Sequence, residues 1–396
     1  MRSIGEGAFY NCSNLSELTI PASVGSISPG AFEGVAPVVL TTAQCPSKMS
    51  KDRLETLIIP EGTERIGKFE FEDCLQLQSL TLPKGLERVE MFAFQGCKNL
   101  KTIVIPDGMC KFEMGAFSGV EPTTLVAAQL PSGEAVMSVK KLEKLIIPEG
   151  VTIVEEKAFS GCENLTSVVF PSTLEVIGGL AFEKCSNLRE VVLPNRLERI
   201  GRGAFKDCNN LTSIVIPPSV RWISDELFYG CSSLMLVDIP ESIEEFGHSA
   251  FEGCESLSTI KFPSKLNAIG RSAFSGCLSL RGKIILPSTL ERLDAQAFAG
   301  CLFLQEIEFL GAPPSGSGLP TMNPKNLQIM NTLSGVYSLK YARAWREQMV
   351  SGQWKGIQMS MKEAWMIYTA IGGILLVVLG SVVIVLLKKR KPKNAA

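Results

Sequence analysis

The segment Leu211-Thr212-Ser213-Ile214-Val215-Ile216-Pro217 decides the fold of this chain. Apolar residues alternate with small or polar ones along it, which is the pattern of a short strand with one buried face. Pro217 ends the strand, because proline has no N–H to donate to a neighbouring strand. A second, shorter apolar pattern then leads the chain towards the next strand, through Val220, Ile223, Phe228 and Cys231.

This unit recurs with a fixed period. The strand-ending prolines occur in two runs with steps of 23 residues and one final step of 24: Pro60, Pro83, Pro106, then Pro148, Pro171, Pro194, Pro217, Pro240, Pro263 and Pro287. The turn phenylalanines keep the 23-residue step: Phe159, Phe182, Phe205, Phe228, Phe251 and Phe274. Such a step, kept over twelve copies, is typical of leucine-rich repeats. One coil buries too little apolar area to fold alone, so the sequence predicts a solenoid of stacked coils with short parallel strands.

Two interruptions of the period resemble each other. Pro21 and Pro60 are 39 residues apart, and Pro106 and Pro148 are 42 residues apart. We interpret the segments near 35–50 and 120–138 as shortened coils without the Ala-Phe turn, produced by duplication of a block of ~85 residues. Each is expected to add one strand, which predicts a solenoid over residues 1–311 with 12 full and two shortened coils.

The pattern Leu-x-x-Ile-x-Ile-Pro followed by Ile-Gly-x-x-Ala-Phe-x-x-Cys resembles the BspA-like leucine-rich repeats of bacterial and protist surface proteins. The resemblance covers residues 1 to about 310, and Ile307 to Pro314 with Tyr337, Tyr341 and Trp345 is similar to the degenerate closing unit of that family. The family implies a surface adhesin or recognition protein. Because ligands differ widely within the family, the resemblance implies only this class of function.

Ten of the twelve cysteines share one register, three residues after the turn phenylalanine: Cys12, Cys74, Cys97, Cys162, Cys185, Cys208, Cys231, Cys254, Cys277 and Cys301. Side chains in register on parallel coils point the same way and not toward each other, which disfavours disulfides. We therefore predict small buried hydrophobes. Cys45 and Cys110 fall outside the register and are left open. No cysteine cluster has the spacing of a zinc site.

Catalytic motifs are missing from the sequence. The single histidine, His248, occupies a turn position held elsewhere by Gly179, Arg202 or Arg271, which favours a solvated turn residue. The pairs Glu155-Glu156 and Glu244-Glu245 likewise fit solvated turns better than an acid/base pair. No phosphate-binding loop or nucleophile elbow is present. We predict a protein that is not an enzyme and has no cofactor and no metal.

The charge distribution separates the last residues from the rest. Five basic residues lie between Lys388 and Lys393, and without them 34 basic and 40 acidic residues give a formal charge of −6. A mildly acidic body without a basic patch argues against nucleic-acid binding.

A single membrane anchor is predicted near the C-terminus. The 22 residues from Met366 to Leu387 contain no charge and would span about 33 Å as a helix, close to the thickness of a bilayer core. Aromatic and basic residues flank the predicted helix of residues 365–387 as interfacial and cytosolic anchors: Trp365, Tyr368, Lys388, Lys389, Arg390 and Lys391. Residues 312–364 would hold the closing unit and a linker, and 388–396 a short basic tail in the cytosol.

Four Asn-x-Ser/Thr sequons mark possible glycosylation sites: Asn11, Asn14, Asn164 and Asn210. Asparagine often precedes the strand leucine in this repeat, so sequons are also expected to occur by chance.

A stripe of outward residues is the candidate binding site. The residue before the last apolar one of each strand points away from the core, and it reads Thr19, Ile58, Thr81, Val104, Ile146, Val169, Val192, Val215, Asp238 and Lys261. We single out the stretch from Ile146 to Lys261, because an exposed apolar stripe with a polar border marks an interaction site. The alternative is that β-branched residues simply favour strands.

These features indicate a single-pass surface protein whose solenoid binds protein or glycan ligands outside the cell. The segment from Met1 to Phe9 has no apolar run of a signal peptide and starts inside a repeat. Either Met1 is not the true start, or the chain is a tail-anchored scaffold that faces the cytosol. Both readings stay open at this stage.

Overall fold

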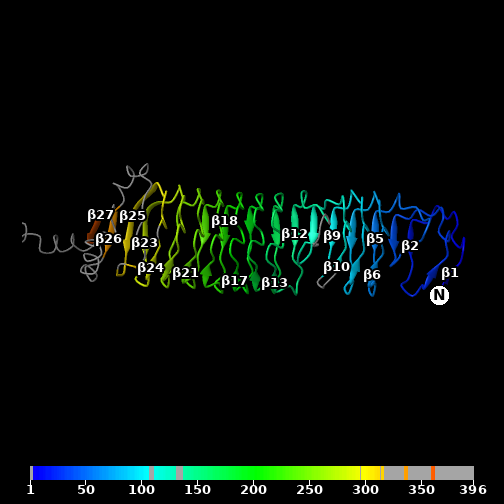
Figure 1. The fold of residues 1–396 in the computed structure, drawn as a ribbon, viewed down its shortest axis with the longest axis horizontal. Coiled ribbons are helices and arrows are strands. Elements are labelled where there is room, and N and C mark those ends of the chain that lie inside the picture. The colour runs from blue at the N-terminus through cyan, green and yellow to red at the C-terminus, as the bar shows by residue number, and fades with distance from the viewer. Residues whose placement is uncertain are drawn as a thin grey trace, which may run out of the picture.

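A computed structural model describes residues 3–106, 111–130, 137–294, 296–312, 314–315, 334–337 and 358–361. Together they form an elongated rod of stacked coils (Figure 1). Every strand pairing among the described residues is parallel, with corresponding residues of successive coils in register. The predicted solenoid of short parallel strands is therefore confirmed.

The first strand of each coil builds a ladder along one side of the rod. Its largest sheet joins eight strands: β2 (Glu17–Thr19), β4 (Val39–Thr41), β5 (Thr56–Ile58), β7 (Ser79–Thr81), β9 (Thr102–Val104), β11 (Thr124–Val126), β12 (Lys144–Ile146) and β14 (Ser167–Val169). Two smaller sheets continue the ladder: β16 (Glu190–Val191), β18 (Ser213–Val215) and β20 (Leu236–Asp238), then β23 (Arg281–Leu286), β25 (Phe303–Phe309), β26 (Ser334–Tyr337) and β27 (Gln358–Met361). Strand pairing is thus interrupted between β14 and β16 and again between β20 and β23.

The second strand of each coil builds another ladder, which carries the lower row of strand labels in Figure 1. Each of its strands has two residues, and they form four sheets: β1 (Ser3–Ile4) and β3 (Ser26–Ile27); β6 (Arg65–Ile66), β8 (Arg88–Val89) and β10 (Lys111–Phe112); β13 (Ile153–Val154), β15 (Val176–Ile177) and β17 (Arg199–Ile200); β19 (Trp222–Ile223), β21 (Glu245–Phe246), β22 (Ala268–Ile269) and β24 (Arg292–Leu293). The described residues of the two shortened coils supply β4 and β11 to the first ladder and no strand to the second.

A column of stacked phenylalanine rings fills the centre of the rod. The turn phenylalanines are all fully buried: Phe159, Phe182, Phe205, Phe228, Phe251 and Phe274. Neighbouring rings lie nearly parallel, with centroids 5.2 to 6.0 Å apart. Such offset stacks add to the free energy gained by removing the rings from water. The column ties each coil to the next across positions 23 residues apart in sequence.

Glycine is required where successive turns touch backbone to backbone. A Cβ atom on Gly201 would lie 2.7 Å from the carbonyl carbon of Gly178 and 2.8 Å from the Cα atom of Gly179 in the preceding coil. No side chain fits at such distances, so the Ile-Gly pair of the repeat sets how closely the turns approach.

None of the described residues lies in a helix long and apolar enough to cross a membrane. The predicted helix of residues 365–387 falls outside the described residues. Of the predicted closing unit and linker, the described part includes β26 and β27, which extend the sheet that begins with β23. Two elements of the first ladder therefore lie beyond residue 311.

Candidate binding face

The outward residues of the first ladder form a continuous row over its largest sheet. Register pairs Thr81 with Val104, Val104 with Val126, Val126 with Ile146, and Ile146 with Val169. Parallel strands place such neighbours about 4.8 Å apart. On each strand, the residue directly before the outward one points into the core, as the fully buried Leu125 and Leu145 do. Alternation along a strand therefore presents this row to solvent.

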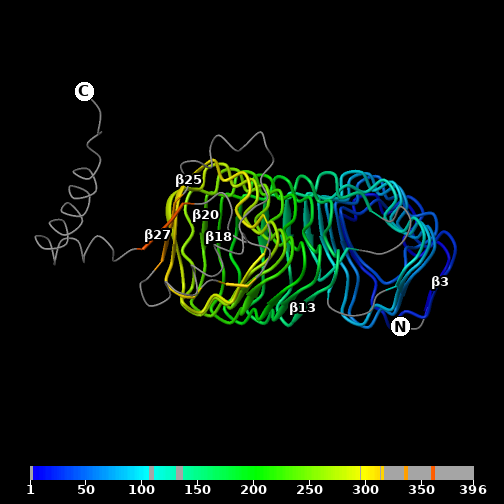
Figure 2. The ribbon, with the colours of Figure 1, turned by 60° about the vertical axis from the view of Figure 1, so that its left-hand side comes forward.

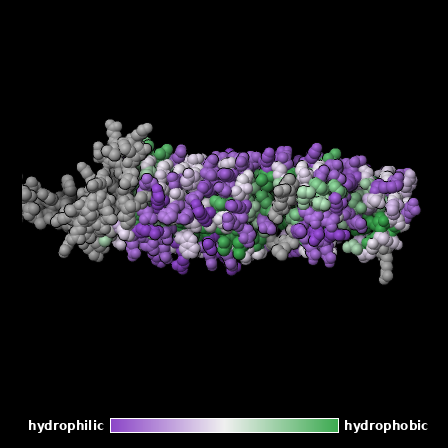
Figure 3. All heavy atoms as spheres, viewed as in Figure 1, coloured by the Kyte–Doolittle hydropathy of each residue, from purple (hydrophilic) through white to green (hydrophobic). Residues whose placement is uncertain are grey.

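The predicted stripe lies on this face with unequal exposure. Val169, Val192 and Val215 are 49%, 83% and 62% exposed, while Ile146 is half-buried. Asp238 and Lys261 are exposed, but Lys261 belongs to no strand. Figure 3 shows apolar surface near the middle of the rod within a largely hydrophilic face.

The sequence reasoning missed two members of the row, Thr41 and Val126. Both lie on the strands of the shortened coils, where no proline follows the strand to mark the position. The signal available was the strand leucine of each segment, because Leu40 and Leu125 align with the buried leucines of full coils. With Val126 included, the apolar run extends from Val104 to Val169 without interruption.

Shallow depressions lie at both interruptions of the first ladder. One of about 620 Å³ lies between β14 and β16 and is lined by Phe170, Val192, Pro194 and Arg196, among others. The other, of about 810 Å³, extends from Met235 beside β20 across the unpaired coil to Phe303 on β25. Val192, beside the first interruption, is the most exposed apolar residue of the predicted stripe.

Charged side chains near the stripe are engaged with neighbours. Lys261 Nζ lies 3.4 Å from Glu241 Oε1, and the Glu241 carboxylate also accepts hydrogen bonds from the N–H and hydroxyl of Ser264. These hydrogen bonds, more than the lysine, lower the pKa of Glu241. Glu149 accepts equivalent bonds from Ser172 at the first depression. The border of the stripe is therefore polar and locally ordered.

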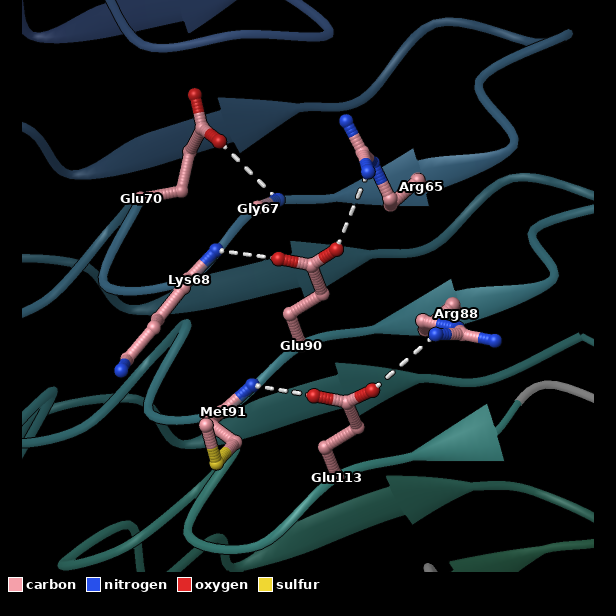
Figure 4. Close-up of polar contacts among 8 residues, drawn as sticks. All are labelled: Arg65, Gly67, Lys68, Glu70, Arg88, Glu90, Met91 and Glu113. Carbon is pink, nitrogen blue, oxygen red and sulfur yellow. Dashed lines mark hydrogen bonds and ion pairs between the residues drawn. The ribbon is translucent and has the colours of Figure 1, made fainter.

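The second ladder carries a repeating polar arrangement that joins coils (Figure 4). Glu90 accepts a hydrogen bond from the N–H of Lys68 at 3.1 Å and lies 3.4 Å from the Arg65 guanidinium. One coil further, Glu113 relates in the same way to Met91 and Arg88. Each acid thus caps a turn N–H and offsets the repulsion between Arg65 and Arg88, which are register neighbours. The arrangement stabilises the stack and leaves no free acid/base pair.

Glu70 occupies a related position with a different outcome. Its carboxylate accepts the N–H of Gly67 at 3.0 Å and that of Cys45 at 2.7 Å. Burial nevertheless raises the pKa of Glu70, because desolvation outweighs these hydrogen bonds.

The in-register cysteines are mostly buried, and all the described cysteines are free thiols. Cys12 and Cys301 correct the prediction, because Cys12 is exposed and Cys301 is half-buried. The sequence reasoning also missed a hydrogen bond: each thiol from Cys185 to Cys301 donates to the carbonyl of the phenylalanine in the preceding coil, as Cys231 does to Phe205 at 3.1 Å. Cys45 packs partly into the core, where burial raises the pKa of its thiol to about 12, and Cys110 lies outside the described residues.

The remaining polar candidates take structural positions. His248 is exposed, and its Nδ1 accepts the N–H of Arg271 at 2.9 Å in the next coil. Glu244 and Glu245 pair with Arg221 and Arg292. Within the described part of the chain, no group of three metal-ligating side chains comes together.

The four sequon asparagines fall into two groups. Asn11 and Asn14 are exposed in the first coil. The Nδ2 atom of Asn164 donates to the carbonyl of Lys140, and that of Asn210 donates to Asn187 Oδ1 at 3.0 Å. Glycosylation would replace one hydrogen of these nitrogens, which already donate to the preceding coil at Asn164 and Asn210. The predicted anchor residues Trp365, Tyr368, Lys388, Lys389, Arg390 and Lys391 lie outside the described residues.

Comparison with known proteins agrees with this geometry. The profile of the BspA type leucine-rich repeat region matches residues 1–51, 48–133, 132–246 and 222–313. A leucine-rich repeat protein from Bacteroides ovatus is 25% identical over 91% of this chain and 87% of its own, with a TM-score of 0.50. A Treponema pallidum (T. pallidum) leucine-rich repeat protein is 27% identical over 55% of this chain and 82% of its own, with a TM-score of 0.28. A leucine-rich cell surface protein from Faecalibacterium prausnitzii is 21% identical over 69% of this chain and 88% of its own, with a TM-score of 0.29. A search of curated proteins found no match. Because the profile matches nearly all of the solenoid, the chain belongs to the BspA-type leucine-rich-repeat family.

Proposed function

We propose that this chain is a membrane-anchored surface recognition protein that binds protein or glycan ligands through the first-ladder face. The observation that carries the proposal is the row of outward β-branched residues, of which Val169, Val192 and Val215 are about half or more exposed. An apolar row of this kind with a polar border fits an interaction surface. Leucine-rich-repeat solenoids are generally protein-binding scaffolds, which supports this role.

A triple substitution of Val169, Val192 and Val215 by threonine tests the face. Threonine keeps the β-branched shape and strand preference but replaces a methyl group by a hydroxyl. The variant and the wild type would be applied to arrays of purified secreted proteins and of glycans. We expect equal circular dichroism and thermal midpoints, with at least a tenfold loss of binding to the ligand that the wild type selects. Unchanged binding by the folded variant would place the site on the turns or the second ladder.

The membrane anchor is tested separately. We expect deletion of residues 366–387 to move the protein from the membrane fraction to the soluble fraction, with ligand binding unchanged. A deletion variant that still sediments with membranes would contradict the proposed anchor.

A tail-anchored scaffold facing the cytosol is the second candidate. It is favoured by the eleven described cysteines, which are all free and include the exposed Cys12. Free thiols persist most readily in a reducing compartment. Protease treatment of intact cells distinguishes the two, because a surface solenoid is digested and a cytosolic one is protected.

A further inference from the structure

The larger depression differs from the rest of the first ladder in three respects: backbone pairing, side-chain hydrogen bonding and charge. It lies where residues 257–263 form no strand between β20 and β23. We refer to it as the gap groove, lined chiefly by Met235, Ser256, Ser258, Ser279, Arg281 and Phe303.

Two irregularities of the repeat adjoin the gap groove. The proline step lengthens from 23 to 24 residues between Pro263 and Pro287. The register of β23 against β25 shifts between Gly282 and Lys283, which leaves Gln305 of β25 without a partner residue in this pairing. A residue without a partner is the mark of a β-bulge. The bulge therefore lies beside Arg281 and Phe303, which line the groove.

Hydroxyl groups in the gap groove lack the partners that asparagine and threonine have at the same positions in several other coils. Two residues after the repeat cysteine, Asn187 and Asn210 donate to the asparagine of the preceding coil. Four residues after it, the Thr212 hydroxyl donates to the carbonyl of Arg189 at 3.3 Å. Serines take these positions in the groove, and the hydroxyls of Ser256, Ser258 and Ser279 make no hydrogen bond to any described residue. They are available to a ligand.

One charged side chain of the groove, that of Arg281, has no ion-pair partner among the described residues. Lys283 lies 2.6 Å from Glu306 and 3.0 Å from Glu308, so the acids of β25 are already paired. Arg281 is exposed and forms no ion pair with the described residues. Glu255 on the adjoining turn contacts Ser279 through its backbone carbonyl at 2.9 Å, and its carboxylate does not reach Arg281. Among the described residues, the Arg281 guanidinium therefore has no acidic partner.

Apolar side chains stand at both ends of the groove. Met235 is 53% exposed and Phe303 is 62% exposed. They lie three coils apart, a span of about 14 Å, which an extended peptide covers in four to five residues at ~3.3 Å each. Arg281 lies between them, two coils from Met235 and one from Phe303.

We propose, building on the recognition function above, that the gap groove binds a short extended peptide that carries one carboxylate between two apolar side chains. The carboxylate pairs with Arg281, the apolar side chains cover Met235 and Phe303, and the serine hydroxyls hydrogen-bond the peptide backbone. A peptide fits better than a sugar, because apolar contacts stand at both ends of a span of this length.

The test begins with a phage-displayed library of random seven-residue peptides, selected on the 396-residue chain. The consensus peptide and its twin with glutamine in place of the acid are then synthesised and titrated by fluorescence anisotropy. We expect an acid flanked by apolar residues in the consensus. Arg281→Gln should weaken binding about tenfold, which corresponds to ~1.4 kcal/mol, and the twin should lose the same factor. The two changes together should add little, because they remove one interaction. Phe303→Ser should weaken both peptides.

Arg199→Gln is the matched control, because Arg199 is an exposed arginine on the second ladder. It should bind like the wild type. The proposal is overturned if no peptide is enriched, if the enriched peptides show no acid, or if Arg199→Gln weakens binding as much as Arg281→Gln. Binding of sialyllactose that depends on Arg281, with no peptide binding, would replace the peptide by an acidic glycan and also overturn it.

The same samples separate this proposal from the proposed function. If the triple threonine variant binds the consensus peptide but the wild type selects no ligand on the arrays, the first-ladder function fails and the groove stands. If the arrays yield a ligand lost in the triple variant while Arg281→Gln leaves all binding intact, the groove fails and the first-ladder function stands.

Discussion

Replacing Phe205 by alanine tests the central column of the fold. The ring is fully buried, with centroids 5.6 Å from Phe182 and 6.0 Å from Phe228. The substitution removes the transfer free energy of the ring and both stacking contacts. It also leaves a cavity between the neighbouring coils. Replacing a buried phenylalanine by alanine lowers the free energy of unfolding by about 3–5 kcal/mol. Because each coil contacts only its neighbours, we also expect the two halves of the rod to unfold at different denaturant concentrations.

Phe9→Ala is the control at the same position of the repeat. Phe9 is 38% exposed, and its ring stacks on that of Phe32 at 4.8 Å. No closed cavity forms there, so the partial loss of burial costs about 1–2 kcal/mol. Guanidinium unfolding followed by circular dichroism gives both values, and native-state hydrogen exchange locates the weakened coils. A loss below about 1 kcal/mol for Phe205→Ala, or an equal loss for both variants, would refute the column as the main source of stability.

Three further predictions concern the turns, an ion pair and the thiols. Gly201→Ala should lower the free energy of unfolding by about 1–3 kcal/mol, because its added Cβ meets the backbone of Gly178. Gly5→Ala is the control: no atom lies within 4 Å of its added Cβ, so the unfolding midpoint should not change. Equal midpoints for the two variants would contradict the close approach of turns. Hydrogen bonds from Lys206 and Arg202 lower the pKa of Glu226. The contribution of this ion pair to stability is therefore present above the ordinary carboxyl range and is lost as pH falls through the lowered pKa. Glu226→Gln should lower the free energy of unfolding by less than about 1 kcal/mol at pH 7. A stability difference from the wild type that persists at pH 2 would argue against the ion pair. Maleimide should label Cys12 rapidly and Cys231 only after unfolding, since Cys12 is exposed and Cys231 is buried; mass spectrometry of the native protein reads this directly, and fast labelling of Cys231 would contradict its burial.

The ring column and the parallel ladders were predictable because a strict period places equivalent residues in equivalent surroundings. Phe205 needs no information beyond its own position in the repeat. Val126 was missed for the opposite reason, because its coil lacks the proline that sets the frame of reference.

The interruptions of the first ladder could not be predicted from the coils in which they occur. The segment from Leu257 to Pro263 has the same apolar spelling as paired coils. It nevertheless forms no paired strand, although the N–H of Arg281 in the following coil donates to the carbonyl of Ser258. A register shift lies beyond it, between β23 and β25. The one-residue step was visible, but its consequence depends on how two coils meet in space. The thiol hydrogen bonds were missed because reading cysteine only as a small hydrophobe leaves its S–H donor out of account.

Side-chain footprinting with hydroxyl radicals, read by mass spectrometry, tests the proposed binding face most directly. It would compare the chain alone with the chain saturated by its array-selected ligand. We predict that labelling of Val169, Val192 and Val215 falls strongly, while Trp222, which is 44% exposed on the second ladder, is labelled as before. Protection of Trp222 with unchanged labelling of Val192 would contradict binding through the first-ladder face.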